Sequence, residues 1–322
     1  MGQWAGVVLA AGRGARMKSR VPKVLHRICG KEMMRYPVEL LRQVGIDRIT
    51  VVASPANGPA VRTLLADEVE YVTQPSALGT GDALARAGEQ LRGGADNLLV
   101  LGADCPLVQA DSVRRLMASH IGASGDMTLL VGHAPSAGDW GRVLRDDSGQ
   151  VVAIVEAADG PEAADSPGEI NGGVYCFAAP WLWENVERIE PGPRGERYLT
   201  SLAAMGAAGG SQVSGVTAAD PSELLGVNNR LQLSQVEGVL RWRIRQRWML
   251  DGVTMADPVS AFIDADVSIG RDTVLLPNTM LLGRTSIGEG CEVGPGSIVR
   301  DSTVGNGCRV TASMLEETTI ED

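Results

Sequence analysis

The chain has 322 residues, of which 44% are hydrophobic, so it can bury the core of one large domain or of two ordinary ones. Its net charge of −10 argues against a general nucleic-acid or membrane-surface binder, although a local basic pocket remains compatible with it. No apolar stretch approaches the roughly 18 residues of a membrane-spanning helix. The five cysteines form no CxxC pair, which favours buried thiols in a reducing compartment and hence a cytoplasmic protein.

The N-terminal region begins with a short apolar run, residues 7–11, that predicts a buried strand. The run breaks into a loop in which Gly12 and Gly14 let the backbone come close to a ligand and point its N–H groups at it. Arg16 and Lys23 add two cations nearby, a combination that suits a triphosphate. The alternative is an ordinary strand-to-helix turn with solvated basic residues, and the Pro-Lys-Val-Leu sequence after the loop favours the phosphate site.

Strands and helices alternate up to about residue 226, which predicts a mostly parallel sheet with helices on both faces. In such sheets ligands bind beyond the carboxyl ends of the strands, where the loops at 12–16 and 102–106 lie. The predicted strands are Val7–Leu9, Ile49–Ala53, Val69–Val72, Asn97–Leu101 and Met127–Val131, and the predicted helices are Met33–Gln43, Pro59–Ala66, Gly81–Leu91 and Ser112–Ser119.

Residues 228–250 carry an aliphatic stripe at helical spacing and predict one long helix that connects two domains. After it the pattern changes to a period of six, which is the hexapeptide repeat of a parallel β-helix. We expect the aliphatic residues to point inward and small residues to occupy the corners, with a one-residue slip before Val304. The aliphatic positions are Ile263, Ile269, Leu275, Leu281, Ile287, Val293 and Val299, and the corner positions are Val267, Thr273, Thr279, Thr285, Cys291, Ser297 and Thr303.

Both halves, in this order, resemble the bacterial bifunctional N-acetylglucosamine-1-phosphate uridylyltransferase/glucosamine-1-phosphate acetyltransferases. The resemblance covers nearly the whole chain and depends on short motifs in a fixed order. The motifs are LAAGRGARM and PKVLH near the start, QPSALGTGDA at 74–83, DCPL at 104–107, GRV at 141–143, IVE at 154–156, EINGGVY at 169–175, GERYLT at 195–200 and GVNNRLQLS at 226–234.

The resemblance implies a Rossmann-like α/β nucleotidyltransferase domain at 1–227, a linker helix at 228–251 and a left-handed parallel β-helix at 252–322. It implies transfer of UMP from UTP to N-acetylglucosamine 1-phosphate, giving UDP-N-acetylglucosamine for cell-wall precursors and pyrophosphate. The acceptor phosphate attacks the α-phosphorus in line, so catalysis consists of positioning and charge neutralisation. The resemblance also implies a homotrimer that associates through the β-helix.

The resemblance also assigns the nucleotide site. Arg16 and Lys23 would face the phosphates, and Gln74 would contact the base, whose edge offers both donors and acceptors. Taken without its neighbours, Gln74 would equally be a polar residue at the end of a strand. The nucleotide-binding residues are Leu9, Ala10, Ala11, Gly12, Gly14, Gln74, Gly79 and Thr80.

Two residues are candidate magnesium ligands. Asp104 follows an apolar strand, and a carboxylate at that position suits a cation that prefers oxygen donors. Asn228 matches the second protein ligand of the family. The alternatives are a solvated loop acid for Asp104 and a helix N-cap for Asn228, although Asn228 can serve as both ligand and cap. Mg²⁺ is the expected cofactor.

The acceptor-sugar pocket is implied at Gly141, Glu156, Asn171, Tyr198 and Thr200. Such oriented polar groups match the hydroxyl and N-acetyl groups of a sugar. Alone, Glu156 would be a solvated surface acid, but its place after an apolar run favours the pocket.

The chain departs from the family pattern at three positions. The family has Tyr where Gly102 stands, Thr or Ala where Gly172 stands, and His where Asp82 stands. The two glycines keep open another acceptor, such as glucose 1-phosphate, and Asp82 would weaken triphosphate binding or face solvent.

The only histidines are His26, His120 and His133, so we expect no acetyl transfer from this chain, which is a truncated or a naturally short relative. A non-catalytic β-helix assembly protein is the alternative of another class.

Overall fold

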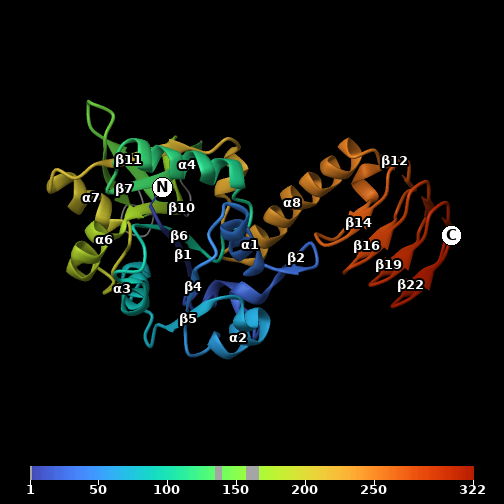
Figure 1. The fold of residues 1–322 in the computed structure, drawn as a ribbon, viewed down its shortest axis with the longest axis horizontal. Coiled ribbons are helices and arrows are strands. Elements are labelled where there is room, and N and C mark those ends of the chain that lie inside the picture. Colours follow the sequence, from blue (N-terminus) through green and yellow to red (C-terminus); the bar gives the residue numbers. More distant parts are fainter. Residues whose placement is uncertain (1, 135–139, 157–166) are drawn as a thin grey trace. The chain divides into compact units, whose positions relative to one another are not determined.

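The computed structural model describes residues 2–134, 140–156 and 167–322, and the chain divides into two compact units. The sheet unit comprises Met1–His26 and Met33–Arg230, and the repeat unit comprises Arg27–Glu32 and Leu231–Asp322 (Figure 1). The division therefore differs from the expected order of contiguous domains, because a short segment within residues 1–227 belongs to the second unit. No helix in the described parts of the chain is long and apolar enough to cross a membrane.

The sheet unit is built on one nine-stranded sheet whose main path runs in the order β11-β7-β10-β6-β1-β4-β5. Neighbouring strands on this path are parallel except at β10, which is antiparallel to both β6 and β7. Strand β8 pairs with β10 and β9 beside this path. The strands are β1 Trp4–Leu9, β4 Ile49–Ala53, β5 Glu70–Thr73, β6 Asn97–Gly102, β7 Met127–Ala134, β8 Arg142–Arg145, β9 Val151–Val155, β10 Gly168–Ala178 and β11 Val213–Thr217.

Helices cover both faces of this sheet, because successive side chains of a strand point to opposite sides. On β6, Leu99 and Leu101 pack in the core formed with α1, α2 and α4, whereas Leu98 and Val100 pack in the core formed with α3, α6 and α7. All four side chains are fully buried. The helices are α1 Arg35–Gln43, α2 Gly58–Leu65, α3 Thr80–Leu91, α4 Ala110–Gly122, α6 Ala179–Asn185 and α7 Ser201–Ala208.

The predicted elements up to residue 131 are confirmed, with ends that differ by a few residues. Strand β10 was not predicted. Its sequence contains two adjacent glycines, and its pairing with β7 shifts register between Asn171 and Tyr175, so the residues there do not alternate as in a regular strand.

The repeat unit contains helix α8, Arg230–Leu250, from its second residue onward, and three four-stranded parallel sheets. The arrangement is that of the left-handed β-helix expected for hexapeptide repeats. All of the predicted inward aliphatic residues are at most 7% exposed. The strands are β12 Thr254–Met255, β13 Phe262–Ile263, β14 Ser268–Ile269, β15 Val274–Leu275, β16 Met280–Leu282, β17 Ser286–Ile287, β18 Glu292–Val293, β19 Ile298–Arg300, β20 Thr303–Val304, β21 Arg309–Val310, β22 Met314–Glu316 and β23 Thr319–Ile320.

The corners of the β-helix carry the predicted small side chains, with one correction. The hydroxyl of Thr279 donates to the Leu276 carbonyl at 2.7 Å, and that of Thr285 donates to the Leu282 carbonyl at 2.7 Å. Thr303 is wrong as a corner residue, since it is exposed and Ser302 is buried instead. The one-residue slip therefore lies before position 302.

The hairpin of β2, Arg27–Ile28, and β3, Lys31–Glu32, packs within the repeat unit. The Lys31 ammonium lies 2.7 Å from the Asp266 carboxylate, and the Ala265 N–H donates to the Cys29 carbonyl at 2.9 Å. This excursion of the chain was not predicted, because its partners follow more than two hundred residues later.

Candidate active site

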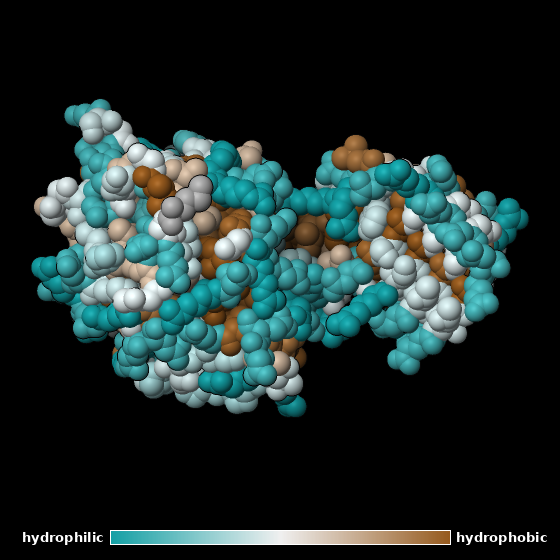
Figure 2. Space-filling model, viewed as in Figure 1, coloured by the Kyte–Doolittle hydropathy of each residue, from teal (hydrophilic) through white to brown (hydrophobic). Residues whose placement is uncertain are grey.

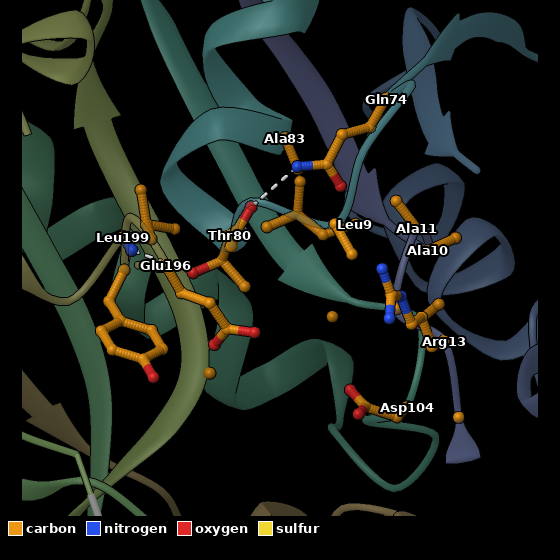
Figure 3. Close-up of a pocket in the computed structure, with 18 of the residues that line it drawn as sticks. Leu9, Ala10, Ala11, Arg13, Gln74, Thr80, Ala83, Asp104, Glu196 and Leu199 are labelled. Carbon is orange, nitrogen blue, oxygen red and sulfur yellow. Dashed lines mark hydrogen bonds between the residues drawn. The ribbon is translucent and has the colours of Figure 1, made fainter. Parts of the chain in front are cut away.

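The sheet unit holds a cleft of about 740 Å³ beyond the carboxyl ends of β1 and β6. The loop after β1 forms one wall, with Arg13 and Asp104 drawn on the same side of the cleft in Figure 3. Gly14 has φ +61°, and a Cβ there would lie 2.7 Å from the Cβ of Lys23. Position 14 therefore needs glycine both for its backbone conformation and for the close approach of the next segment.

Lys23, Asp104 and Asn228 meet in this cleft although they are far apart in the sequence. The Lys23 ammonium lies 2.5 Å from Oδ2 of Asp104 and 3.2 Å from Oδ1 of Asn228. Burial by itself would raise the pKa of Asp104, but the charge of Lys23 outweighs it and holds that pKa below its usual value. The carboxylate is therefore ionised at neutral pH, and two oxygen atoms converge on one cation.

The segment that leads into α3 forms the opposite wall and is fastened to residues 197–199. The Arg197 N–H donates to the Leu78 carbonyl at 2.7 Å, and the Gly81 N–H donates to the Arg197 carbonyl at 2.8 Å. The Leu199 N–H donates to the Thr80 hydroxyl at 2.9 Å (Figure 3). These bonds connect the two segments of the wall, residues 78–81 and 197–199, so the Gly79 backbone is held in place from two sides.

The third side of the cleft carries polar groups suited to a sugar. The Thr200 hydroxyl donates to Oε1 of Glu156 at 2.6 Å, and both residues line the cleft with Tyr198. Gly141 and Asn171 are not among its lining residues. They lie behind Tyr175, which does line the cleft. The Asn171 side-chain amide donates to the Tyr175 hydroxyl at 2.6 Å, and the Asn171 backbone N–H donates to the Gly141 carbonyl at 2.9 Å.

The cleft thus brings together the predicted nucleotide, phosphate and metal residues with part of the predicted sugar set. The predicted residues that line it are Leu9, Ala10, Ala11, Gly12, Gly14, Arg16, Lys23, Gln74, Gly79, Thr80, Asp104, Glu156, Tyr198, Thr200 and Asn228. Sequence reasoning missed Arg13, Tyr175, Arg194 and Glu196 as lining residues. Arg13 could have been found from its place between the two loop glycines, whereas nothing in the sequence places Arg194 here.

The three departures from the family pattern have different environments. Gly102 lines the cleft. Gly172 does not, and a Cβ there would lie 2.8 Å from the Leu130 carbonyl oxygen. Asp82 is 4% exposed and hydrogen-bonded, so the expectation that it faces solvent is wrong.

The donor set of the cleft fits a magnesium ion. Its candidate ligands are the oxygens of Asp104 and Asn228, which already converge on the Lys23 ammonium. Magnesium is bound through few protein oxygens and keeps several waters or phosphate oxygens. The described residues contain no cluster of three or more His, Cys, Asp or Glu side chains that would hold a metal by themselves.

Comparison with known proteins gives two family matches. Residues 6–209 match the MobA-like NTP transferase domain, and residues 266–301 match the bacterial transferase hexapeptide repeats. A relative from Caldanaerobacter subterraneus, named bifunctional protein GlmU, is 42% identical over 98% of this chain and 68% of its own length. A relative of the same name from Pelotomaculum thermopropionicum is 42% identical over 99% of this chain and 70% of its own length. A third, from Shouchella clausii, is 37% identical over 98% of this chain and 70% of its own length.

These matches cover both units and agree with the resemblance drawn from the motifs. They confirm an enzyme with a nucleotidyltransferase domain, and they exclude the alternative of a non-catalytic assembly protein. The chain belongs to the GlmU family of bifunctional proteins.

Proposed function

We propose that the cleft transfers UMP from UTP to N-acetylglucosamine 1-phosphate and releases pyrophosphate. The observation that carries this proposal is the convergence of Lys23, Asp104 and Asn228 beside a glycine loop, since Gly14 packs against Lys23. A cation bound by anionic and amide oxygens beside the N–H groups of a glycine loop matches the needs of a polyphosphate.

Each wall then has a part in the reaction. The backbone at Gly12 and Gly14 and the side chain of Arg16 bind the triphosphate. The acceptor phosphate oxygen forms a bond to the α-phosphorus while the bond from that phosphorus to the bridging oxygen of pyrophosphate breaks. No protein nucleophile is needed, because the acceptor is itself an anionic oxygen and the chain only has to align it and screen its charge.

Magnesium would be held by Asp104 and Asn228. When bound, it neutralises phosphate charge and so lowers the repulsion between the two anionic substrates. Lys23 keeps positive charge next to the same oxygens and orients the Asp104 carboxylate. The lowered pKa of Asp104 keeps the carboxylate ionised in the working pH range.

The acceptor sugar would be bound on the side of the cleft formed by Glu156, Tyr198 and Thr200. Glu156 and Thr200 form a polar pair that suits sugar hydroxyl groups, and Asn171 and Gly141 support it from behind through Tyr175. Gly102 leaves the cleft without a side chain at a position where the family has tyrosine, and this favours glucose 1-phosphate as the second candidate acceptor.

Pyrophosphate release from UTP in millimolar Mg²⁺, measured with a panel of sugar 1-phosphates, tests the proposal. N-acetylglucosamine 1-phosphate should give the highest kcat/KM. Asp104→Asn should lower it about 100-fold, whereas the matched control Asp111→Asn, at a carboxylate that is 89% exposed on α4, should not. A folded wild-type protein without activity on any sugar phosphate would refute the function.

Acetyl transfer is not part of the proposal. The resemblance attributes this second reaction to a set that includes a histidine, and residues 134–322 contain none. We expect no acetylation of glucosamine 1-phosphate by this chain with acetyl-CoA, which a free-thiol assay measures. A thiol signal above that of the heat-denatured protein would contradict this expectation.

The repeat unit supports a homotrimer. Phe262, Met280, Ile298 and Met314 lie opposite one another on consecutive strands of one sheet and form an outward apolar row. The corresponding rows of the other two sheets contain mainly polar residues, and Figure 2 shows hydrophobic residues between hydrophilic rows on this unit. Exposed apolar rows of this kind favour association between copies of a chain.

Sedimentation at several concentrations tests the trimer. Ile298→Glu should shift the protein to monomer, and Ser286→Glu, on the polar row of another sheet, should leave its mass unchanged.

A cytoplasmic location remains our expectation, because UTP is the proposed substrate and most of the cysteines are buried and all are unpaired.

A further inference from the structure

Asp82 is a buried acid that the proposed reaction does not use. It lies near the start of α3 and is 4% exposed. Its Oδ2 accepts a hydrogen bond from the Gln74 amide nitrogen at 2.8 Å, and its Oδ1 lies 3.4 Å from the Arg86 guanidinium. An acid in this position therefore has a partner on each oxygen and is fixed relative to Gln74.

The Gln74 amide is oriented by these contacts. Its nitrogen donates to Asp82 and, at 3.0 Å, to the carbonyl of Gly79. An amide group has two N–H donors, so both are used, and both partners can only accept. A rotated amide would place its oxygen against two other oxygens, which is unfavourable. The orientation is thus decided by Asp82 and Gly79 rather than by Gln74 itself.

The amide oxygen is the part of Gln74 that remains for a ligand. Gln74 lines the cleft, and Figure 3 shows its oxygen on the side of Leu9, away from the bond to Gly79. Within the described ranges 2–134, 140–156 and 167–322, no hydrogen bond to this oxygen is found. The wall therefore presents an acceptor near the start of α3, where the backbone N–H groups of Gly79 and Thr80 have no partner within the helix.

We propose that Asp82 is a positioning residue that makes the cleft selective for uracil over cytosine, an inference that depends on the proposed UTP site. Uracil offers a donor at N3–H next to an acceptor at O4, which complements an acceptor from Gln74 and a backbone donor from residues 79–80. Cytosine offers an acceptor at N3 next to a donor at N4, so both contacts become repulsive. A glutamine that could rotate would suit either base, and Asp82 opposes that rotation together with the Gly79 carbonyl.

The test compares UTP with CTP, both as equilibrium binding to the enzyme and as kcat/KM for pyrophosphate release. Asp82→Leu should reduce the preference for UTP about tenfold, through a higher KM for UTP and a lower one for CTP, with kcat at saturating UTP nearly unchanged. Asp82→Asn retains an acceptor oxygen and should keep more of the preference. Glu89→Gln removes an exposed carboxylate from the same helix and should have no effect.

A double variant separates positioning from a general structural role. If Asp82 acts through Gln74, then Asp82→Leu should not change the UTP-to-CTP ratio further in a Gln74→Ala background. An unchanged ratio in folded Asp82→Leu, or an equal further loss in the double variant, overturns the inference while the proposed reaction stands. Failure of wild-type protein to bind UTP overturns both, whereas binding without turnover of any sugar phosphate overturns the proposed reaction alone.

Discussion

Replacing Gly79 by alanine should separate the two segments of the wall that we propose to bind the base, residues 78–81 and 197–199. Gly79 has φ +101°, and a Cβ there would overlap the Arg197 carbonyl oxygen and lie 2.7 Å from the Arg197 nitrogen. Both atoms are backbone, so no side-chain rotation relieves the contact. The residues around Arg197 must move, and the bonds from Arg197 to Leu78 and from Gly81 to Arg197 are weakened.

The expected cost of this substitution is about 3–5 kcal/mol, from an unfavourable backbone conformation and an overpacked contact. Gly93, at the other end of α3, is a matched control, because it has φ +72° and no neighbouring atom lies within 4 Å of the place that a Cβ would take. Gly93→Ala should cost only about 1–2 kcal/mol. For a unit of this size, these costs should lower the melting temperature relative to the wild type by about 10 °C in Gly79→Ala and by about 4 °C in Gly93→Ala.

Two measurements check this prediction. Scanning calorimetry gives the melting temperatures, and initial rates give KM for UTP, which should rise about tenfold in Gly79→Ala and stay constant in Gly93→Ala. Equal melting temperatures for the two variants would refute the steric argument. An unchanged KM for UTP in Gly79→Ala would refute the assignment of this wall to the base.

Three further predictions follow from the site and the core. Lys23→Met removes the cation that neutralises phosphate charge, so turnover should fall about 100-fold. The same change frees the Asp104 and Asn228 oxygens. Calorimetric titration of the nucleotide-free enzyme should therefore show tighter Mn²⁺ binding than in the wild type. Thr200→Val removes the 2.6 Å bond to Glu156 and should raise KM for the sugar phosphate about tenfold without changing KM for UTP; equal rises for both substrates would contradict a sugar pocket. Burial lowers the pKa of His120 to about 4. Between pH 6.5 and 4 the unfolded chain therefore takes up a proton that the folded chain does not. The free energy of unfolding should fall by about 3 kcal/mol as the pH drops through that range. Urea unfolding at several pH values should show a smaller fall for His120→Gln.

The parts of the fold that were predicted are those in which burial follows a regular period. The apolar run of β6 and the hexads from Ile263 to Val299 specify their own burial, because one period fits one kind of element. Strand β10 lacks such a period, since adjacent glycines and a change of register interrupt it. The corner at 302 was assigned one residue late for a similar reason, because the repeat shortens there without a glycine or proline to mark it.

Most of the residues that were expected in the site line the cleft, but their contacts with one another were not predictable. Motifs identified Lys23 and Asp104 separately, one as a phosphate ligand and the other as a metal ligand. Their ion pair joins positions 81 residues apart and depends on how β1 and β6 pair in the sheet. The position of Asp82 against Gln74 likewise depends on the path of the loop between them, so the sequence suggested a solvated or repulsive acid where the structure has an orienting one.

The hairpin at Arg27–Glu32 limits how this chain can be recombined with a relative. The chain passes between its units after His26, after Glu32 and again after Arg230. A chimaera joined once, at the start of α8, would combine the hairpin of one parent with the repeats of the other. The ion pair of Lys31 with Asp266 would then join side chains from different parents, whereas the bond between Ala265 and Cys29 links backbone atoms and does not depend on residue type. An exchange of the repeats should therefore include the hairpin, because the second unit is formed by two separate stretches of the chain.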